Sequence, residues 1–316
     1  RRQATVSALI IERAAPIMQL QDLGRFGVAH HGLSQGGPMD LHAHCWANRL
    51  LGNPVSCATI EITFGNTEFS TQKDTWLALC GADMHATIEG KPVPTWSSFL
   101  LKNNQSLKLS YTCAGMHSYL AATGGFDSSR ILESQSTVLR NDIGNLLNPD
   151  DQVRIHGSQF DGPATYTPPC YIPDYSDQIE LRMISYGEET PEVFQTQFSV
   201  SQRSNRMGSI LETKSPLSPK SGIISEALPI GTVQLPPDGK PIILLNDRQT
   251  QGGYYKLGSI MRCDLPKIAQ APPGTRVSIR QVDLESARKE WLEFCHFFRL
   301  LGRKKSQGVM VCHDSL

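Results

Sequence analysis

The sequence predicts a mainly β protein with some α-helix, because short β-like runs dominate its 316 residues. In the first half these runs end at Gly, Asn, Asp or Pro and recur about every ten residues: ATIEITF, TWLALCG, HATIEG, FLLKN, SLKLSY, HSYLAATGG and QVRIHG. This rhythm favours sheets or barrels over alternating strand–helix–strand units.

One helix is predicted in the first half, from about Met39 to Leu51. The segment carries alanine and leucine, and Gly52-Asn53-Pro54 ends it. Asp40 stands where an N-cap residue would accept a hydrogen bond from the first turn. These elements make residues 1–160 an N-terminal β-rich subdomain with a helix near 39–51.

A proline-rich stretch at residues 161–175, DGPATYTPPCYIPDY, is predicted as a linker. Proline fixes φ and removes a ladder donor, so the stretch is unsuited to a central strand. A second β-rich block covers residues 176–282, with the runs IELRMISYG, FSVSQ, GIISE, GTVQLP, PIILLND and RVSIRQV. The turn PPDGKP between two of these runs predicts a hairpin.

The chain closes with a predicted helix and tail at residues 283–316. Its apolar residues recur at spacings of three and four, which places them on one helical stripe: Leu284, Ala287, Trp291, Phe294, Phe298 and Leu301. We expect the stripe to dock on its own domain; contact with a partner chain is the alternative.

Charge and cysteine usage exclude several classes of protein. Thirty basic residues balance 30 acidic ones, and no basic stripe with interleaved aromatics indicates nucleic acid as a partner. No apolar run has the length of a signal-peptide core or a membrane span. The eight cysteines form no C-x-x-C pair, which argues against a zinc knuckle or a thioredoxin-type motif, and no metal site is predicted. Since neither a signal peptide nor a membrane span is indicated, a reduced, cytoplasmic setting is expected.

The glycine-rich stretch QDLGRFGVAHHGLSQGGPMD, residues 21–40, matches neither a dinucleotide fingerprint nor a phosphate loop. Its glycines suit a loop with positive φ angles that approaches another group closely. Arg25 could hold an anion through two hydrogen bonds. The adjacent His30 and His31 do not favour a metal site.

A polar cluster follows an apolar run in LLNDRQTQGGYYKLGSI, residues 244–260. Such a strand would deliver side chains to a glycine-lined small-molecule site; a solvated hairpin end is the alternative. The candidate residues are Asn246, Asp247, Arg248, Gln249, Gly252, Gly253 and Tyr254.

Two further loops carry polar chemistry. Arg203 and Arg206 are three residues apart, so their guanidiniums could jointly hold a carboxylate or phosphate; two exposed arginines are the alternative. Residues 121–137 combine Gly124-Gly125 with a hydroxyl-rich loop, for which a plain turn is the simpler interpretation. No G-x-S-x-G elbow is present.

These clusters, taken as a set and in order, resemble the biotin-dependent carboxyltransferase family of allophanate hydrolase subunit 2 type. The resemblance rests on QDLGRFG, GGPMDLHAHCWANRLLGNP, TIEITFG, YLAATGGFD, RMGSILE, LPIGTVQLPPDGKPIILLNDRQTQGGYYKLGSI and DLPKIAQAPPGTRV, and it covers about residues 9 to 290. Two positions depart from the family. Glu133-Ser134-Gln135 stands where the family usually has a small Gly-Ser, and the GGP of residues 36–38 replaces a more common Gly-Ala.

The resemblance implies a cyclophilin-like β-barrel architecture and two β-rich subdomains. A free-standing chain with no fused biotin domain is most similar to the C subunits of bacterial 5-oxoprolinases. That similarity implies a role in the ATP-dependent opening of 5-oxo-L-proline to L-glutamate, with ATP and its Mg counter-ion. The implied partners are a related subunit of B type and a hydrolase subunit of A type.

The candidate residues receive roles on this hypothesis. Substrate carboxylate or phosphoryl oxygens would be bound by Arg25, Arg203, Arg206 and Arg248. Asp247, or else Asp40, would assist proton transfer. The lactam would be held by Asn246, Gln249 and the Gly252-Gly253 amides, with Tyr254 as a wall. The hypothesis requires sheet ends from both halves of the chain to converge on one anionic ligand.

Two other functions remain open. The first is carboxyl transfer from carboxybiotin to urea or a related amide, for which biotin would have to arrive on another chain. The second is a non-enzymatic regulator that binds a kinase-inhibitor protein, with the closing helix as its contact surface.

Overall fold

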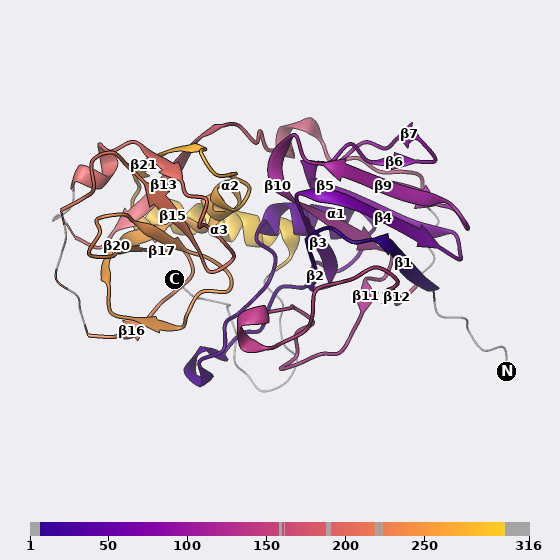
Figure 1. Cartoon of the computed structure of the whole chain (residues 1–316), viewed down its shortest axis with the longest axis horizontal. Helices are drawn as coiled ribbons and strands as arrows, with labels where there is room; N and C mark the ends of the chain where they lie inside the picture. The colour runs from indigo at the N-terminus through magenta and orange to yellow at the C-terminus, as the bar shows by residue number, and fades with distance from the viewer. Residues whose placement is uncertain are drawn as a thin grey trace. The chain divides into compact units, whose positions relative to one another are not determined.

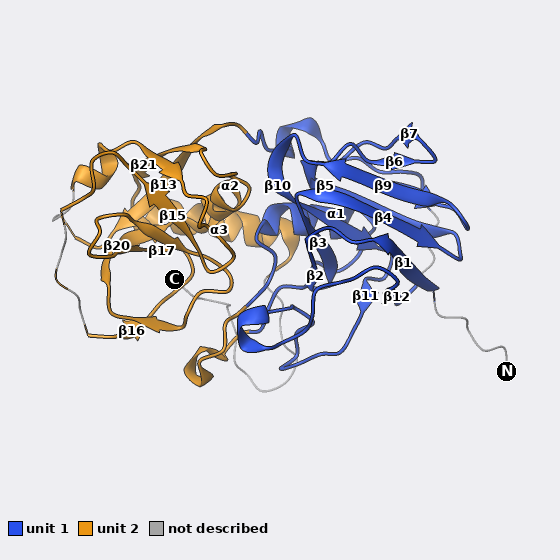
Figure 2. Cartoon of the chain, in the orientation of Figure 1, with its two compact units in different colours: residues 1–25, 36–175 blue, residues 26–35, 176–316 orange. Residues whose placement is uncertain are grey.

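The computed structural model describes residues 7–157, 160, 162–187, 191–218, 221 and 224–300 (Figure 1). The chain forms two compact units (Figure 2). Unit 1 contains residues 1–25 and 36–175, and unit 2 contains residues 26–35 and 176–316. The predicted fold class is confirmed: strands dominate both units, and unit 2 is built on a closed barrel.

Unit 1 is a pair of sheets. Its strands are β1 (Ser7–Arg13), β2 (Ile17–Gln21), β3 (Thr59–Thr63), β4 (Gly65–Thr71), β5 (Thr75–Asp83), β6 (Thr87–Ile88), β7 (Lys91–Pro92), β8 (Ser97–Leu101), β9 (Ser106–Tyr111), β10 (Ala114–Ala122), β11 (Phe126–Asp127) and β12 (Gln152–Ile155). One sheet has the order β11-β12-β1-β4-β9-β6-β7 and the other β2-β3-β10-β5-β8 (Figure 1).

The core of unit 1 lies between these two sheets. Leu9 and Phe69 from the first sheet belong to one buried apolar cluster with Ile60, Leu79 and Leu120 from the second. Successive strand residues point to opposite faces, so the outer face of the second sheet needs its own cover. Helix α1 (Leu41–Leu50) supplies it by packing on β5 and β10.

The proline-rich stretch predicted as a linker is held against unit 1. Ser98 N donates to Thr165 O at 2.9 Å, and Thr167 N donates to Trp96 O at 2.9 Å. Thr165 Oγ1 donates to Leu50 O at 2.8 Å, at the end of α1. Because proline has no backbone N–H, the residues between the prolines form the hydrogen bonds that attach this stretch to unit 1.

Unit 2 is a seven-stranded closed barrel of order β13-β20-β17-β18-β15-β14-β21. Its strands are β13 (Gln178–Ser185), β14 (Phe198–Val200), β15 (Gly208–Glu212), β17 (Thr232–Leu235), β18 (Ile242–Leu244), β20 (Tyr255–Ile260) and β21 (Arg276–Gln281). The predicted hairpin is confirmed, since Val233 pairs with Ile243 across PPDGKP. Gly239 takes a φ of 73° in that turn, which glycine adopts without strain.

Part of the GIISE run is not a barrel strand. Residues 222 and 223 lie outside the described residues, and Ile224 is 92% exposed. The run ends in β16 (Glu226–Ala227), which pairs with β19 (Gln251–Gly252) as a separate two-stranded sheet. An apolar run is therefore not sufficient for a barrel position.

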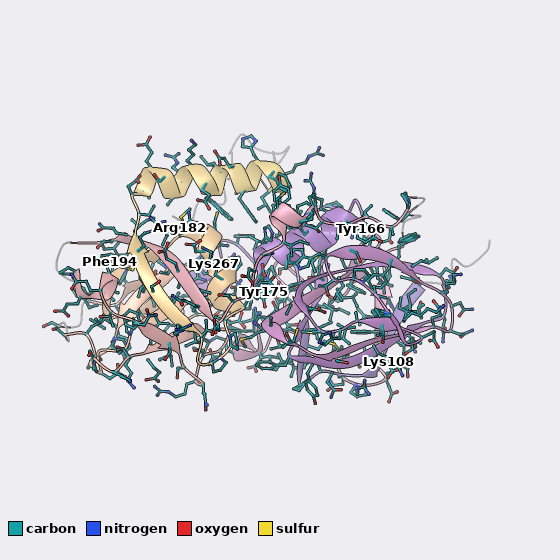
Figure 3. All side chains as sticks on the ribbon, turned by 90° about the horizontal axis from the view of Figure 1, so that it is seen from above. Lys108, Tyr166, Tyr175, Arg182, Phe194 and Lys267 are labelled. Carbon is teal, nitrogen blue, oxygen red and sulfur yellow. The ribbon has the colours of Figure 1, made fainter. Side chains whose placement is uncertain are left out.

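The closing helix is α3 (Leu284–Phe298), and Asp283 caps it by accepting from Ser286 N. Ala287, Cys295 and Phe298 are buried, whereas Leu284 is half exposed, and Leu301 lies outside the described residues. Figure 3 shows Arg182 and Lys267 on the side of the barrel that carries α3.

An ion cluster ties this helix to the barrel. The Arg182 guanidinium donates to both carboxylate oxygens of Asp264, at 2.8 and 2.7 Å, and to both of Glu290 on α3, at 2.7 and 2.9 Å. Lys267 of α2 (Leu265–Ala269) also contacts Asp264, at 2.9 Å. The pKa of Arg182 is raised by these carboxylates. Helix α3 is thus anchored by charge as well as by its buried side chains.

Among the described residues, no helix has both the length and the apolar character needed to cross a membrane. Over the same part of the chain all seven cysteines are free thiols.

Candidate functional site

The barrel brings one set of loops to a common rim. Strands β18 and β20 both run antiparallel to β17, so their final residues lie at the same end of the barrel. Gly231, just before β17, links the two ends: its N–H donates to Leu244 O and its carbonyl accepts from Ile260 N, both at 2.8 Å. Strand β15 starts at this end, because Gly208 pairs with Leu244. We call this end the β18 rim.

Asp247 and Arg206 form a buried ion pair on the β18 rim. Arg206 Nε donates to Asp247 Oδ2 at 2.7 Å, and Arg206 Nη2 donates to Asp247 Oδ1 at 3.0 Å. The side chains are 15% and 9% exposed. Asp247 N also donates to Arg206 O at 2.9 Å. Because both carboxylate oxygens hold Arg206, the geometry favours a positioning role for Asp247 over proton transfer.

Arg248 is the next residue, and it is bound differently. Its Nε donates to Leu228 O at 2.7 Å and its Nη1 to Leu245 O at 3.4 Å. Among the described residues it forms no ion pair. Burial, followed by the nearby charge of Arg262, lowers its pKa to about 10. Arg248 is therefore a largely buried cation at neutral pH, and within the described ranges its side-chain hydrogen bonds go to carbonyl groups.

Part of the glycine-rich stretch also reaches this turn. Residues 26–35 group with unit 2, and Ser34 Oγ donates to Arg248 O at 2.8 Å and lies 3.3 Å from Asp247 O. The hydroxyl thereby fixes the backbone that presents Asp247 and Arg248. Ser34 of the glycine-rich stretch is thus in contact with the turn that carries Asp247 and Arg248.

A pair of side-chain amides gathers over Gly252. A Cβ built on Gly252 would lie 2.8 Å from Leu228 Cδ1, 3.0 Å from Gln234 Nε2 and 3.2 Å from Gln249 Nε2. Gln234 is 2% exposed, and its Nε2 has no hydrogen-bond partner among the described residues. Gly252 is needed here for space. Sequence reasoning missed Gln234, which looks like any polar residue in the strand TVQL.

The remaining candidates of residues 203–254 differ in exposure. Asn246 is buried, Gly253 is half-buried, and Tyr254 is 44% exposed. Arg203 is 65% exposed and pairs with Glu212 at 3.4 Å, whereas Arg206 turns to Asp247. The two guanidiniums therefore contact different carboxylates. This differs from the expectation that Arg203 and Arg206 jointly hold one anion.

Arg25 belongs to unit 1 and is 1% exposed. Its Nη2 donates to Ser136 O at 2.6 Å and its Nε to Ile131 O at 3.5 Å. A Cβ on Gly36 would lie 3.4 Å from Arg25 Nη1 and 2.8 Å from Val138. Arg25 thus braces the 131–138 loop against the glycine-rich stretch.

Asp40 is completely buried in unit 1 and caps α1, accepting from Ala43 N at 2.9 Å. It also accepts from Tyr175 Oη at 3.1 Å. Its own N–H donates to Tyr119 Oη at 2.7 Å, and that hydroxyl donates to the buried carboxylate of Glu61 at 2.9 Å. Burial, Glu61 and Asp40 raise the pKa of Tyr119 well above its usual value. This network supports the fold below α1.

The loop with the Glu133 departure is ordered by a carboxylate from the end of β2. Asp22 accepts from Ser134 Oγ at 2.6 Å, Ser136 Oγ at 2.7 Å and Gln135 N at 2.7 Å. Glu133 is exposed and takes a φ of 65°, the left-handed region that glycine favours. The hydroxyls of Ser134 and Ser136 are thus used to hold the loop on Asp22, which is a structural role.

No group of three or more His, Cys, Asp and Glu side chains suited to a metal ion occurs within the described ranges. The chemistry that the β18 rim and the Gly252 surroundings offer is therefore cationic and amide-based. A buried guanidinium, two side-chain amides and glycine backbone can bind carboxylate, phosphoryl and carbonyl oxygens. They supply no nucleophile of their own.

Residues 31–281 match the family model described as the carboxyltransferase domain, subdomains A and B. The chain is 31% identical to the 5-oxoprolinase C subunit of Haemophilus influenzae over 281 residues, covering 85% of this chain and 90% of that protein. It is 32% identical to the 5-oxoprolinase C subunit of Escherichia coli over 303 residues, covering 93% and 97% respectively. A putative urea carboxylase of Emericella nidulans is 28% identical over 83% of this chain, which spans 23% of that protein.

Two solved structures have a similar fold. The crystal structure of TTHA0988 gives a TM-score of 0.82 at 28% identity, covering 89% of this chain and 57% of that one. The urea amidolyase of K. lactis gives a TM-score of 0.83 at 21% identity over 96% of this chain, which spans 20% of that protein. The chain thus spans a little over half of TTHA0988 and a fifth of the amidolyase.

Proposed function

The chain belongs to the carboxyltransferase domain family, subdomains A and B, and from that premise we propose that it is one subunit of an ATP-dependent 5-oxoprolinase. The proposed reaction opens 5-oxo-L-proline to L-glutamate together with partner subunits of A and B type. Two relatives named as the C subunit of 5-oxoprolinase support it, because they align over 90% and 97% of their own lengths.

The observation that carries the proposal is the state of Arg248. A largely buried guanidinium with no ion-pair partner in the described chain favours an anionic ligand, because buried charges are normally paired. The Gln234 and Gln249 amides lie near Gly252, and so does the side chain of Leu228. The backbone carbonyl of Leu228 accepts a hydrogen bond from Arg248 Nε. A ligand with a carboxylate and an amide carbonyl, such as 5-oxoproline, suits this combination of donors.

In the proposed reaction these guanidinium and amide donors stabilise developing negative charge. A lactam carbonyl is a poor electrophile, but transfer of the γ-phosphoryl group of ATP to its oxygen makes the carbon reactive. One water can then add with cleavage of the ring C–N bond, and a second water releases phosphate. Negative charge develops on phosphoryl and carbonyl oxygens, and fixed guanidinium and amide donors stabilise it. In this scheme Asp247 keeps Arg206 in place, while Arg248, Gln249 and the Gly252-Gly253 backbone contact the substrate.

The test is reconstitution. The chain is co-expressed with its candidate A and B subunits, and ATP hydrolysis and glutamate formation are measured with and without 5-oxoproline. The proposal expects 5-oxoproline to stimulate both. Purified complex with no stimulation by 5-oxoproline would contradict the proposal. Binding to a partner protein without any turnover would instead favour the regulator hypothesis.

A second candidate function is carboxyl transfer from carboxybiotin to urea or a related amide. The similarity to the putative urea carboxylase, at 28% identity over 83% of this chain, favours it. The same guanidinium and amide donors would bind the carboxyl group. This function predicts biotin-dependent incorporation of labelled bicarbonate, with biotin on a separate carrier, and no effect of 5-oxoproline on ATP hydrolysis.

A further inference from the structure

Gln234 lies on the outer face of the barrel strand β17. Its neighbour Val233 pairs with Ile243, and both are completely buried. Gln234 pairs with Ile242 on one side and Lys256 on the other, and both of these are partly exposed. Because successive strand residues point to opposite faces, Val233 faces the barrel interior and Gln234 faces outward. An outward polar side chain is normally solvated, yet Gln234 is only 2% exposed, so other residues cover it.

The cover of Gln234 has a fixed part and an open part. The fixed part is Gly252, in the two-stranded sheet β16–β19, and Leu228, which follows β16 and whose N–H donates to Thr250 O at 3.0 Å. The open part is Gln249, which is exposed and whose side chain forms no hydrogen bond with any residue that the structure describes. Gln249 can therefore turn toward solvent without breaking a bond of the barrel, and this movement gives a ligand access to the Gln234 amide.

The two glutamine amides lie close to one place. A Cβ built on Gly252 would lie 3.0 Å from Gln234 Nε2 and 3.2 Å from Gln249 Nε2, so both nitrogens are about one hydrogen-bond length from the same point. Gln234 Nε2 is buried and has no hydrogen-bond partner among the described residues. A buried donor without an acceptor is costly, so its partner is expected to be a water or a ligand. One acceptor oxygen beside Gly252 is within reach of both amides.

The side chain of Gln234 presents a donor, Nε2–H, beside an acceptor, Oε1. Lactam and ureido groups carry their N–H and C=O on the same side, so they can pair with a carboxamide through two antiparallel hydrogen bonds. A trans peptide bond has these groups on opposite sides and does not pair in this way. We propose that Gln234 determines specificity by binding this cis-amide edge. Its Nε2 and that of Gln249 donate to the ligand carbonyl oxygen, and its Oε1 accepts from the ligand N–H.

This inference rests on the proposed function for the identity of the lactam, 5-oxoproline, and it adds a residue that the proposed reaction scheme does not use. Recognition of the N–H separates a lactam from a lactone. A buried acceptor that is built for an N–H is left unpaired by an analogue without one, and such analogues are bound more weakly. Urea, the ligand of the second candidate function, carries the same edge and is distinguished from the lactam by experiment.

The experiment measures ligand binding to the full-length chain by calorimetry and by the side-chain amide signals of Gln234 in nitrogen-15-labelled protein. The ligands are 5-oxoproline, its lactone analogue with a ring oxygen in place of the N–H, and urea. The lactam and the lactone share the carboxylate and the carbonyl group. We expect 5-oxoproline to shift the Gln234 signals and the lactone to bind at least about tenfold more weakly. Shifts caused by urea alone would identify a ureido group as the source of the edge.

Matched variants identify the residues. Gln234→Met keeps the length of the side chain but removes its donor and its acceptor, so it should abolish the discrimination between lactam and lactone, which a purely structural role would not do. Gln249→Met, at an exposed position, should weaken lactam and lactone equally, by about three- to tenfold, and tests the shared carbonyl oxygen if Gln234→Met fails to fold. Gln178→Met, at an exposed position of β13, is the control and should leave both affinities unchanged.

Gln234 signals that do not respond to saturating 5-oxoproline or urea would overturn the proposal and leave water as the partner of this amide. Equal affinity of the wild-type chain for lactam and lactone would also overturn it, as would full discrimination in Gln234→Met or unchanged binding in Gln249→Met. The assay needs no partner subunit and no ATP. Its failure would leave the reconstituted reaction untouched, so the two outcomes are distinguishable.

Discussion

The Arg206–Asp247 pair gives the sharpest test of how the β18 rim is held together. Asp247→Asn removes the charge with little change in shape, and Arg206→Met removes the guanidinium but keeps much of the apolar stem. The two contacts of 2.7 and 3.0 Å, together with exposures of only 15% and 9%, place the pair in the class of partly buried ion pairs.

The magnitude follows from that burial. Two charges about 4 Å apart interact by about 4 kcal/mol at an effective dielectric constant of about 20. Removal of one partner from a buried pair costs about 3–5 kcal/mol, because the remaining charge loses its compensation. We therefore expect each single variant to lower the free energy of unfolding of unit 2 by about 3 kcal/mol, and the double-mutant cycle to give a coupling of about 2–3 kcal/mol.

The assay is hydrogen exchange of barrel peptides in increasing urea, which follows unit 2 separately from unit 1. The Arg203–Glu212 pair, with side chains 65% and 33% exposed, is the matched control and should give a coupling below about 1 kcal/mol. A coupling for Arg206–Asp247 that is no larger than the control would refute the reasoning that this pair fixes the rim.

Three further predictions concern other parts of the chain. Tyr119→Phe should destabilise unit 1 by about 2–3 kcal/mol in urea denaturation, because Glu61 and the Asp40 N–H lose a buried partner; an unchanged midpoint would contradict this. Burial raises the pKa of Asp264, but hydrogen bonds from Arg182 and Lys267 outweigh it and leave the pKa lowered, so its stabilisation is present above pH about 4 and lost as pH falls through the folded pKa. Asp264→Asn should therefore cost about 3–5 kcal/mol at pH 7 and less below pH about 4 in parallel denaturation curves, and a penalty independent of pH would argue against the charge. Gly252→Ala should reduce 5-oxoproline-stimulated turnover at least tenfold, since its Cβ would meet Leu228 and Gln234 at 2.8 and 3.0 Å, whereas Gly187→Ala, which meets nothing within 4 Å, should be silent.

Local sequence patterns were sufficient for the regular elements. Alternation and turn residues predicted most strands, and the PPDGKP turn predicted the pairing of β17 with β18. The helix after Asp40 could be predicted because its cap and its stop at Gly52-Asn53-Pro54 are both local. The GIISE run was predicted as part of the β-rich block, but its end pairs with β19 outside the barrel. An apolar segment does not reveal whether a barrel strand is free to pair with it.

The partners of polar side chains could not be predicted in the same way. Arg206 and Arg203 are close in sequence, yet Arg206 pairs with Asp247, 41 residues away, because β15 and β18 are neighbours in the barrel. The surroundings of Gln234 depend on its burial, which a single polar letter in a strand does not reveal. Arg25 and Asp40 were singled out for substrate chemistry, but in unit 1 both are buried and hydrogen-bonded to the fold.

The most direct test of the proposed site is the 5-oxoproline-stimulated ATP hydrolysis of the reconstituted complex carrying Arg248→Gln, with Arg203→Gln as the matched control. Loss of one charged hydrogen-bonding group to a substrate or transition state typically costs about 2–5 kcal/mol, or at least about thirtyfold in kcat/KM. We expect a loss of that size for Arg248→Gln, with intact assembly, and near wild-type activity for Arg203→Gln. Undiminished stimulated turnover in the Arg248→Gln complex would contradict the assignment of the β18 rim as the substrate site.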